Sequence, residues 1–272
     1  MQNYSSSLYE MISSFWRNRH LIMTLVEREV LGKYRGSIFG VLWSFFNPAL
    51  LLFIYTYVFS IIFKARWADA EDSKITFALV LFAGMIPFNL FSECFTRAPG
   101  LILSNVNYVK KVVFPLEILP WVIMGSALFH ALITFGVWLV AYTLFFGFPG
   151  PTVIFFPIVL IPLIFTTMGI CWGIAALGVF LRDIGQFINL AVTALMFLSP
   201  VFYPISSLPP KFRFYAYLNP LSFPIEQSRQ VLFWGQLPNT SYLIAYSIFS
   251  IAIAFLGFSW FQKTRKGFAD VL

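Results

Sequence analysis

Six long apolar stretches limit what this chain can fold into more than any other feature does. A helix crosses the hydrocarbon core of a bilayer when it has about 20 mostly apolar residues, each adding about 1.5 Å of length. Six stretches approach or exceed this length, over residues 37–63, 75–95, 116–146, 153–180, 185–202 and 242–261. The sequence therefore predicts an all-α membrane protein, with six transmembrane helices in a single domain of residues 1–272.

The composition excludes a soluble globular domain of this size. Of the 272 residues, 59% are hydrophobic and only 11% are charged, whereas about 25% are charged in a typical soluble domain. The two cysteines, Cys94 and Cys171, lie inside apolar stretches, so we expect packing residues rather than a disulfide. The first fifteen residues have no long apolar core and no small-residue cleavage site, which predicts no signal peptide.

Lysine and arginine residues are divided unequally between the two sides that six crossings create. Cytoplasmic loops of membrane proteins carry an excess of these residues. The richer side has Arg17, Arg19, Arg28, Lys33, Arg35, Arg97, Lys110, Lys111, Arg182, Lys263, Arg265 and Lys266. The poorer side has Lys64, Arg66, Lys74, Lys211, Arg213 and Arg229. This distribution predicts that both termini are cytoplasmic. It also assigns the net charge of +7 to membrane topology rather than to nucleic-acid binding.

Residues 16–31 precede the first span and can form a helix that is apolar over roughly half its circumference. Such a helix suits the cytoplasmic interface of the membrane. Glu29 falls within the apolar arc. Either Glu29 has a polar partner, or the helix packs on protein as well as on lipid.

Two further segments join spans without crossing. The inner loop of residues 96–115 contains a short stretch compatible with a helix, near residues 101–109. The outer segment of residues 203–241 is rich in proline and aromatic residues, and we expect a short helix over residues 223–234. Helices favour proline in the first turn and glycine just past the end, and Pro224 and Gly235 occupy these two places. We expect re-entrant or gate helices here, between spans five and six.

The chain lacks the motifs of several kinds of enzyme. It contains no G-x-x-x-x-G-K-[ST] loop to hold the phosphates of ATP, and no H-E-x-x-H or paired-cysteine metal spacing. We therefore expect no cofactor and no metal in this chain. His130 lies in mid-span, where a neutral packing histidine is favoured over a functional one. For Glu93 and Glu117, structural pairing with Arg97 or Lys110 is favoured over a proton relay.

Aromatic residues make up 20% of the chain. Lipid-facing phenylalanines and interfacial belts of Trp and Tyr explain most of them. The alternative is an aromatic path over which sugar rings slide. Stacking on an aromatic face tolerates sliding because it does not require a fixed hydrogen-bond register, as the binding of unstacked bases to aromatic side chains illustrates. The candidates for this path are Trp43, Phe45, Phe46, Tyr55, Tyr57, Phe197, Phe202 and Tyr203.

Three sequence blocks, over residues 28–48, 104–120 and 198–209, stand in a characteristic order and spacing. They read REVLGKYRGSIFGVLWSFFNP, SNVNYVKKVVFPLEILP and LSPVFYPISSLP, and LNPLSFPIEQSRQVL follows the third. Together they resemble the ABC-2 type permeases that export cell-surface polysaccharides, namely lipopolysaccharide O-antigen, group 2 capsule and wall teichoic acid. The likeness covers nearly the whole chain.

The resemblance implies a function and partners. It implies the permease subunit of an ABC transporter in the bacterial inner membrane, a homodimer that works with two copies of a separate ATPase, which binds ATP and Mg²⁺. The substrate would be a polysaccharide linked to undecaprenyl diphosphate, with O-antigen as the first expectation, moved from cytoplasm to periplasm. The alternatives within transport are an exporter of capsule or teichoic acid and an exporter of a drug or a small lipid. A membrane-embedded glycosyl- or acyltransferase and a structural scaffold are the alternatives outside it.

The resemblance also assigns roles to residues. Coupling to the ATPase would fall to the inner loop and to the turn between spans four and five: Asn105, Asn107, Lys110, Lys111, Arg182 and Asp183. The alternative for the two lysines is that their charge only sets the membrane topology. The alternative for Arg182 and Asp183 is a local ion pair. Cations beside span one could bind the pyrophosphate of the substrate headgroup, or only anchor the helix: Arg28, Lys33 and Arg35, with Tyr34 beside them. The periplasmic gate would include Pro204, Glu226 and Arg229, and Glu226 would pair with Arg229 to hold a closed state.

Overall fold

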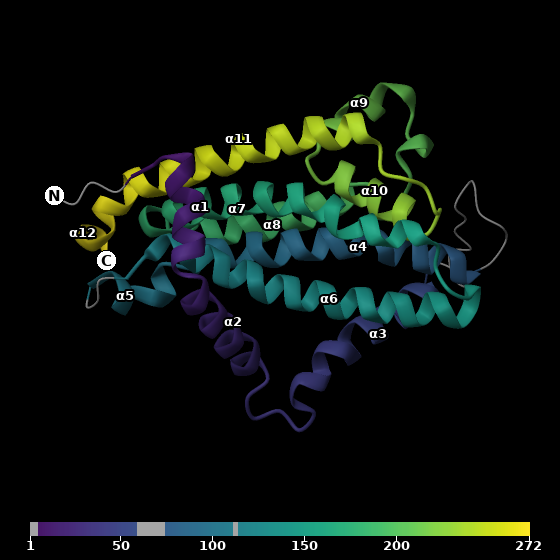
Figure 1. The fold of residues 1–272 in the computed structure, drawn as a ribbon, viewed down its shortest axis with the longest axis horizontal. Coiled ribbons are helices and arrows are strands. Elements are labelled where there is room, and N and C mark those ends of the chain that lie inside the picture. The colour runs from purple at the N-terminus through teal and green to yellow at the C-terminus, as the bar shows by residue number, and fades with distance from the viewer. Residues whose placement is uncertain (1–4, 59–73, 111–113) are drawn as a thin grey trace.

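The computed structural model describes residues 5–58, 74–110 and 114–272, and helices are its only regular structure over this part of the chain (Figure 1). The α-helices are α1 (Leu8–Arg17), α2 (Arg19–Lys33), α3 (Trp43–Tyr55), α4 (Lys74–Arg97), α5 (Val106–Lys110), α6 (Leu119–Phe146), α7 (Phe156–Phe180), α8 (Ile184–Leu198), α9 (Pro210–Leu218), α10 (Ser222–Leu232), α11 (Thr240–Thr264) and α12 (Phe268–Val271). Short 3₁₀ turns link them: η1 (Gly40–Leu42), η3 (Ala98–Gly100), η4 (Leu103–Asn105), η5 (Leu116–Ile118), η6 (Pro151–Phe155), η7 (Ile205–Ser207) and η8 (Arg265–Gly267).

The prediction of an all-helical membrane protein is confirmed, and five helical runs are long and apolar enough to cross a bilayer. They are Gly40–Val58, Ile75–Gly100, Leu116–Phe146, Pro151–Phe180 and Thr240–Val271. The predicted fifth span corresponds to α8, which has 15 residues. At about 1.5 Å per residue it is about 22 Å long, shorter than a hydrocarbon core of about 30 Å. Residues 59–63 of the predicted first span lie outside the described residues.

Helix α4 is the centre of the bundle. Every residue from Thr76 to Phe88 is buried, because α3, α6, α7, α8 and α10 all pack against this helix. Trp138 of α6 donates a hydrogen bond from its indole nitrogen to the carbonyl of Leu79, over 3.0 Å. That bond satisfies the polar atom of a large side chain that is otherwise wholly surrounded by apolar groups.

Helices α7 and α11 run side by side in the same direction and approach closely. A Cβ atom added at Gly257 would overlap the carbonyl of Gly169, and one added at Gly169 would overlap the backbone of Ile253. One turn earlier, the Thr166 hydroxyl donates to the Ser250 hydroxyl over 2.8 Å. Small residues that let two backbones meet are the usual contact between membrane helices, because lipid provides no hydrophobic drive for association.

The segment before the first span is two helices. The helix predicted over residues 16–31 forms as α2 (Arg19–Lys33), with its start three residues later, and α1 before it was not predicted. Helix α1 ends at Asn18, whose side-chain nitrogen donates to the Ser14 carbonyl over 2.8 Å. An asparagine that bonds to the backbone in this way competes with helix continuation. The chain then turns, α2 runs away from the bundle, and α2 and α3 form a V in Figure 1.

Helix α2 packs on protein through its apolar side. Ile22 and Leu25 form a small buried cluster with Ile118 and Val122. Farther along, a Cβ added at Gly125 of α6 would lie 2.5 Å from the Val26 side chain. Position 125 is therefore a glycine at the point where α2 crosses α6.

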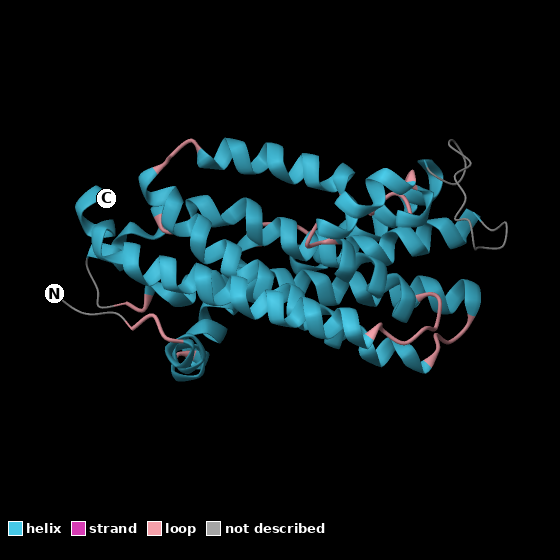
Figure 2. Cartoon of the chain, turned by 90° about the horizontal axis from the view of Figure 1, so that it is seen from above, coloured by secondary structure: helices cyan, strands magenta, loops and turns pink. Residues whose placement is uncertain are grey.

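Both ends of the described chain lie at the same end of the bundle (Figures 1 and 2). The Ser259 hydroxyl, near the end of α11, donates to the Ser6 carbonyl over 3.1 Å. We refer to the end that holds α1, α5 and α12 as the terminal end, and to the end that holds α9 and α10 as the opposite end. Figure 1 shows these two groups of helices at opposite ends of the long axis.

Candidate functional site

A charged cluster joins α2 to α4 and α6 near the terminal end. The Glu93 carboxylate of α4 accepts from His130 Nδ1 at 2.9 Å, and it lies 3.6 Å from Lys33 Nζ and 3.8 Å from an Arg97 guanidinium nitrogen. Arg97 also pairs with Glu29 of α2. Glu93 therefore has the predicted arginine partner. Glu29 thus has a polar partner, and α2 also packs on protein, so both alternatives predicted for this helix hold.

His130 connects this cluster to the end of α2. Its Nε2 lies 3.3 Å from the Tyr34 hydroxyl. A neutral ring that donates from Nδ1 to Glu93 accepts at Nε2, so the tyrosine is the donor. Burial and the nearby Glu93 carboxylate raise the pKa of the Tyr34 hydroxyl above its ordinary value. The hydroxyl thus keeps the proton that it donates. Both ring nitrogens of His130 have partners, and its neutral packing role in mid-span stays a prediction.

We expect Tyr34→Phe to lower the free energy of unfolding by about 1 kcal/mol, the net value of a typical hydrogen bond. The change leaves the His130 acceptor without its donor and keeps the ring. Thermal unfolding of the purified protein in detergent measures the effect. Tyr215→Phe is the matched control, because Tyr215 is exposed and makes no hydrogen bond in the described structure. Equal midpoints for the two variants would contradict the role of this bond.

The predicted headgroup residues have different surroundings. Arg28 donates to the Tyr108 hydroxyl of α5 over 3.1 Å, and Lys33 faces Glu93. Arg35 is exposed and forms no ion pair with any described residue. Of the three predicted cations, Arg35 alone has a charged group that forms no hydrogen bond or ion pair with the described part of the chain.

The predicted coupling residues come together at the terminal end. Asn107 and Lys110 are exposed on α5, and Arg182 and Asp183 are exposed in the turn between α7 and α8. A Cβ added at Gly178, just before that turn, would overlap the Pro99 carbonyl that leads into the inner loop. This close approach brings the two loops to one surface.

The remaining details of this surface modify the predicted roles. Asn105 donates from its side chain to the Leu101 carbonyl over 2.9 Å, which is a local bond within the loop. Arg182 and Asp183 form no ion pair with each other in the structure. Lys111 lies outside the described residues. Glu117 pairs with Arg265 over 2.5 Å and accepts from Ser14 over 3.0 Å, so the predicted partners Arg97 and Lys110 are wrong for this carboxylate.

The predicted aromatic residues form two groups on separate helices. At the start of α3, Trp43, Phe45 and Phe46 are exposed, and their rings meet edge to face at 6.2 and 6.4 Å between centroids. Farther along, Tyr57 is exposed and Tyr55 is half-buried. At the end of α8, the Phe197 ring centroid lies 5.8 Å from that of Phe202, and the Tyr203 hydroxyl donates to the Phe197 carbonyl over 3.1 Å. One copy of the chain does not line up all eight residues in one row.

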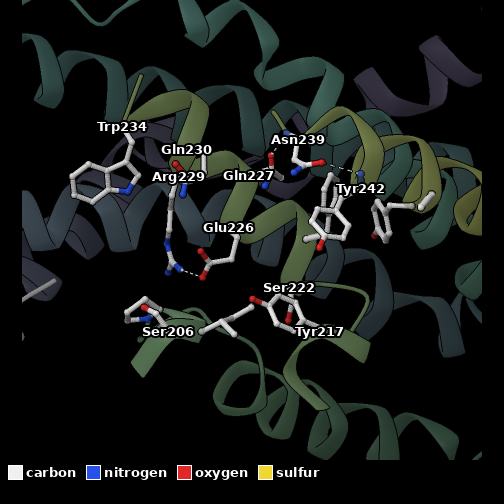
Figure 3. A pocket seen from close by; sticks show the side chains of 15 residues that line it. Ser206, Tyr217, Ser222, Glu226, Gln227, Arg229, Gln230, Trp234, Asn239 and Tyr242 are labelled. Atoms are coloured by element: carbon white, nitrogen blue, oxygen red, sulfur yellow. Dashed lines mark hydrogen bonds and ion pairs between the residues drawn. The ribbon is translucent and has the colours of Figure 1, made fainter. Parts of the chain in front are cut away.

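The predicted gate residues lie at the opposite end, where they line a cavity of about 750 Å³ (Figure 3). Pro204 of the segment after α8 forms part of its wall, and Glu226 and Arg229 project from α10. The two side chains point toward one another in Figure 3, with 3.3 Å between carboxylate and guanidinium. The predicted pairing of these two residues is present.

Arg229 is fully buried, and backbone carbonyls satisfy its guanidinium. It donates to the carbonyls of Pro200, Val201 and Val80 over 2.6, 2.5 and 3.2 Å. Burial lowers the pKa of Arg229 to about 10, against the opposing effect of Glu226, so the side chain is still charged at neutral pH. It lies directly on α4, because a Cβ added at Gly84 would be 2.8 Å from its Nε.

Several of these residues carried a weak signal in the sequence. Gly84, Gly169 and Gly257 are small residues inside apolar stretches, and such residues mark close helix contacts in membranes. The signal does not say which helix is the partner. The link from Ser14 through Glu117 to Arg265 joins residues up to 251 positions apart. No local sequence pattern predicts it.

Residues 20–233 match the family model described as ABC-2 type transporter. The chain belongs to this family. The predicted resemblance to ABC-2 permeases is therefore confirmed. The chain is 25% identical over 265 residues to the O-antigen export system permease protein of Myxococcus xanthus, covering 97% of this chain and 99% of that protein. It is 26% identical over 254 residues to the protein of the same description from Klebsiella pneumoniae, covering 93% and 95%.

The likeness within the ABC-2 family extends to a second kind of transporter. The chain is 25% identical over 261 residues to the polysialic acid transport protein of Escherichia coli, covering 93% of this chain and 96% of that protein. These relatives are matched from end to end.

Proposed function

We propose that this chain is the permease subunit of an ABC transporter that exports a lipid-linked polysaccharide from cytoplasm to periplasm. The observation that carries the proposal is the end-to-end match to proteins described as O-antigen export permeases and polysialic acid transport proteins. O-antigen is the first candidate because three of these relatives carry that description. A capsule-type polymer is the second, because of the polysialic acid relatives.

The topology that we propose has six crossings and two cytoplasmic termini. Both ends of the described chain lie at one end of the bundle, which requires an even number of crossings. Counting α8 as the sixth gives that number, although α8 is short, and the irregular residues that follow it extend its reach. Re-entrant structure of this kind is tolerated where protein buries it, and α9 and α10 pack at that end.

The proposed orientation places the terminal end in the cytoplasm. Arg17, Arg28 and Arg97 lie there, together with the exposed Lys110 and Arg182. An excess of such residues is typical of cytoplasmic loops. A bacterial inner membrane is the corresponding location.

In the complete transporter we propose two copies of this chain and two copies of a separate ATPase, which binds ATP and Mg²⁺. The ATPase would contact the exposed side chains of α5 and of the α7–α8 turn, namely Asn107, Lys110, Arg182 and Asp183. The exposed aromatic side chains of α3 and of the end of α8 would line the path of the polymer between the two copies. Within one copy these faces have few partners, which supports a role in the assembly.

The test is the ATPase activity of the co-purified complex, with and without glycan linked to undecaprenyl diphosphate. We expect co-purification at one ATPase per permease, and ATP hydrolysis that rises when the lipid-linked glycan is added. Stimulation by a range of small amphiphilic drugs, with none by the glycan, would overturn the proposal in favour of a drug exporter.

We expect Arg35→Gln to raise the concentration of lipid-linked glycan needed for half-maximal stimulation roughly tenfold. A charge-assisted hydrogen bond to a pyrophosphate contributes about 1.5–3 kcal/mol, and Arg35 has a guanidinium available for it. Lys263→Gln is the matched control, because Lys263 is an exposed residue of the same proposed side. Equal effects of the two changes would reduce Arg35 to a residue that sets topology.

A further inference from the structure

The cavity at the opposite end is bounded by α10, by the start of α11 and by the segment that carries η7 and α9 (Figure 3). Its volume of about 750 Å³ is within the range of about 300–1,000 Å³ that small-molecule sites occupy. Of its lining, the proposed gate uses Pro204, Glu226 and Arg229. The remaining side chains have no assigned role.

The lining combines aromatic rings with amides. Tyr217, Trp234 and Tyr242 supply rings, and Gln227, Gln230 and Asn239 supply carboxamides. Tyrosine and tryptophan present an apolar body with a polar tip. A carboxamide has both donors and an acceptor. The oxygens of Gln227 and Asn239 already accept from the backbone N–H groups of Asn239 and Tyr242, so these two side chains offer a ligand their N–H donors. A sugar has matching properties, since its C–H faces are apolar and each hydroxyl both donates and accepts.

Gln230 borders the cavity and carries a polar atom that has no partner in the described structure. Its side-chain oxygen is buried and has no hydrogen-bond partner among the described residues. Buried polar atoms in folded proteins nearly always have a partner, and an unsatisfied one costs about 1–3 kcal/mol. A carbonyl oxygen can be satisfied only by a donor. A hydroxyl brings a donor, whereas an ionised phosphate brings acceptors alone.

The charges of the lining lead to the same ligand class. Arg229 donates to Glu226 and to carbonyls of Val80 and Pro200, so its positive charge is compensated and its donors are directed into the protein. Among the described residues that line the cavity there is no lysine, and Arg229 is the single arginine. The cavity is thus suited to an uncharged, hydroxyl-rich ligand rather than to a lipid pyrophosphate or a phospholipid headgroup.

We propose that this cavity is a glycan subsite, in which one or a few sugar residues of the transported polymer bind at the exit end of each copy. The source of the sugar rests on the proposed function. The site itself rests on the cavity, its aromatic and amide lining and the unsatisfied oxygen of Gln230.

The experiment is a fluorescence titration of the purified full chain in nanodiscs. The probe is a water-soluble oligosaccharide, released by mild acid from the surface polysaccharide of the source cell. Trp234 lines the cavity, so we expect a saturable change in tryptophan emission that is absent from Trp234→Phe. Dextran of matched size and phosphatidylglycerol are titrated in parallel. A saturable response to phosphatidylglycerol alone would overturn the proposal, because the cavity would then be a lipid site.

Two variants test the assignment of individual side chains. We expect Gln230→Leu to raise the Kd for the oligosaccharide at least tenfold while the thermal midpoint stays unchanged or rises, because the variant removes an unsatisfied acceptor. Tyr217→Ala should also weaken binding, and its ring is 69% exposed, so its loss does not threaten the fold. Gln236→Leu is the matched control, because Gln236 is exposed and outside the lining.

The outcomes separate the subsite from the proposed function. An unchanged Kd in both variants would overturn the subsite. So would the absence of oligosaccharide binding in a complex whose ATPase is stimulated by the lipid-linked glycan, and the proposed function would then stand. Absence of that stimulation, with binding at the cavity intact, would overturn the exporter and leave a glycan-binding membrane protein.

Discussion

Gly257→Ala is expected to destabilise this protein by about 3 kcal/mol or more. The added methyl group would overlap the carbonyl of Gly169 on the neighbouring helix. Overpacking typically costs about 1–3 kcal/mol, and this case belongs at the upper end because the obstructing atoms are backbone and cannot rotate away. Helices α7 and α11 would have to separate, which also breaks the bond between Thr166 and Ser250. Thermal unfolding in detergent and size-exclusion profiles measure the loss.

Gly173→Ala is the matched control, because Gly173 is on α7, the helix that Gly257 of α11 contacts, and a Cβ there would meet nothing within 4 Å. Replacing a glycine inside a helix by alanine gains about 0.5–1 kcal/mol. The two changes add the same methyl group and are expected to act in opposite directions. A Gly257→Ala protein as stable as the Gly173→Ala protein would show that α7 and α11 do not approach as closely as described.

Arg229→Met is expected to have the second large effect, a loss of about 3–5 kcal/mol. Removing one partner of a buried ion pair costs this much because the groups left behind are buried without compensation. Here those groups are the Glu226 carboxylate and the carbonyls of Val80, Pro200 and Val201. The measurement is the yield of monodisperse protein in the membrane fraction, together with its thermal midpoint.

Glu226→Gln separates the carbonyl bonds of Arg229 from its ion pair. The amide oxygen still accepts from Arg229, and the Glu226 side chain is 25% exposed. We therefore expect Glu226→Gln to cost roughly a third of what Arg229→Met costs. If the two variants lost equal stability, the ion pair rather than the carbonyls would hold α10 against α4, and the described arrangement would be wrong on that point.

The sequence was sufficient for elements whose signal is local. The predicted span over residues 116–146 coincides with the run Leu116–Phe146, and that over residues 153–180 nearly coincides with Pro151–Phe180. The outer helix was placed by Pro224 and Gly235, and it forms as α10 with Gly235 at a positive φ of 64° just beyond its end. Apolar length, proline and glycine act on the chain around them, so one sequence reveals them.

Other features depend on contacts between distant segments. Asn18 divides the predicted interfacial helix through a bond to Ser14, and an apolar periodicity does not register such a break. Glu117 bonds to Arg265, although Arg97 and Lys110 are nearer in sequence. Charges at the same end of a bundle are equally plausible partners until the packing of α11 brings one of them close.

The candidate site was predictable to different depths. The resemblance to ABC-2 permeases suggested Glu226 as a partner of Arg229 in the gate, and the structure has that contact. It gave no reason to expect that Val80 and Pro200 also accept from Arg229, because these carbonyls belong to other segments. The unsatisfied oxygen of Gln230 is likewise visible only in three dimensions.

ATP-driven movement of the polymer is the most direct test of the account. Inverted membrane vesicles that contain the permease and its ATPase would be loaded with lipid-linked polysaccharide on their outer leaflet and supplied with ATP. The account predicts that a growing fraction of the glycan becomes protected from an added glycosidase, and that none does when the permease is absent or ATP is withheld. Glycan that stays fully digestible while the complex hydrolyses ATP would contradict it.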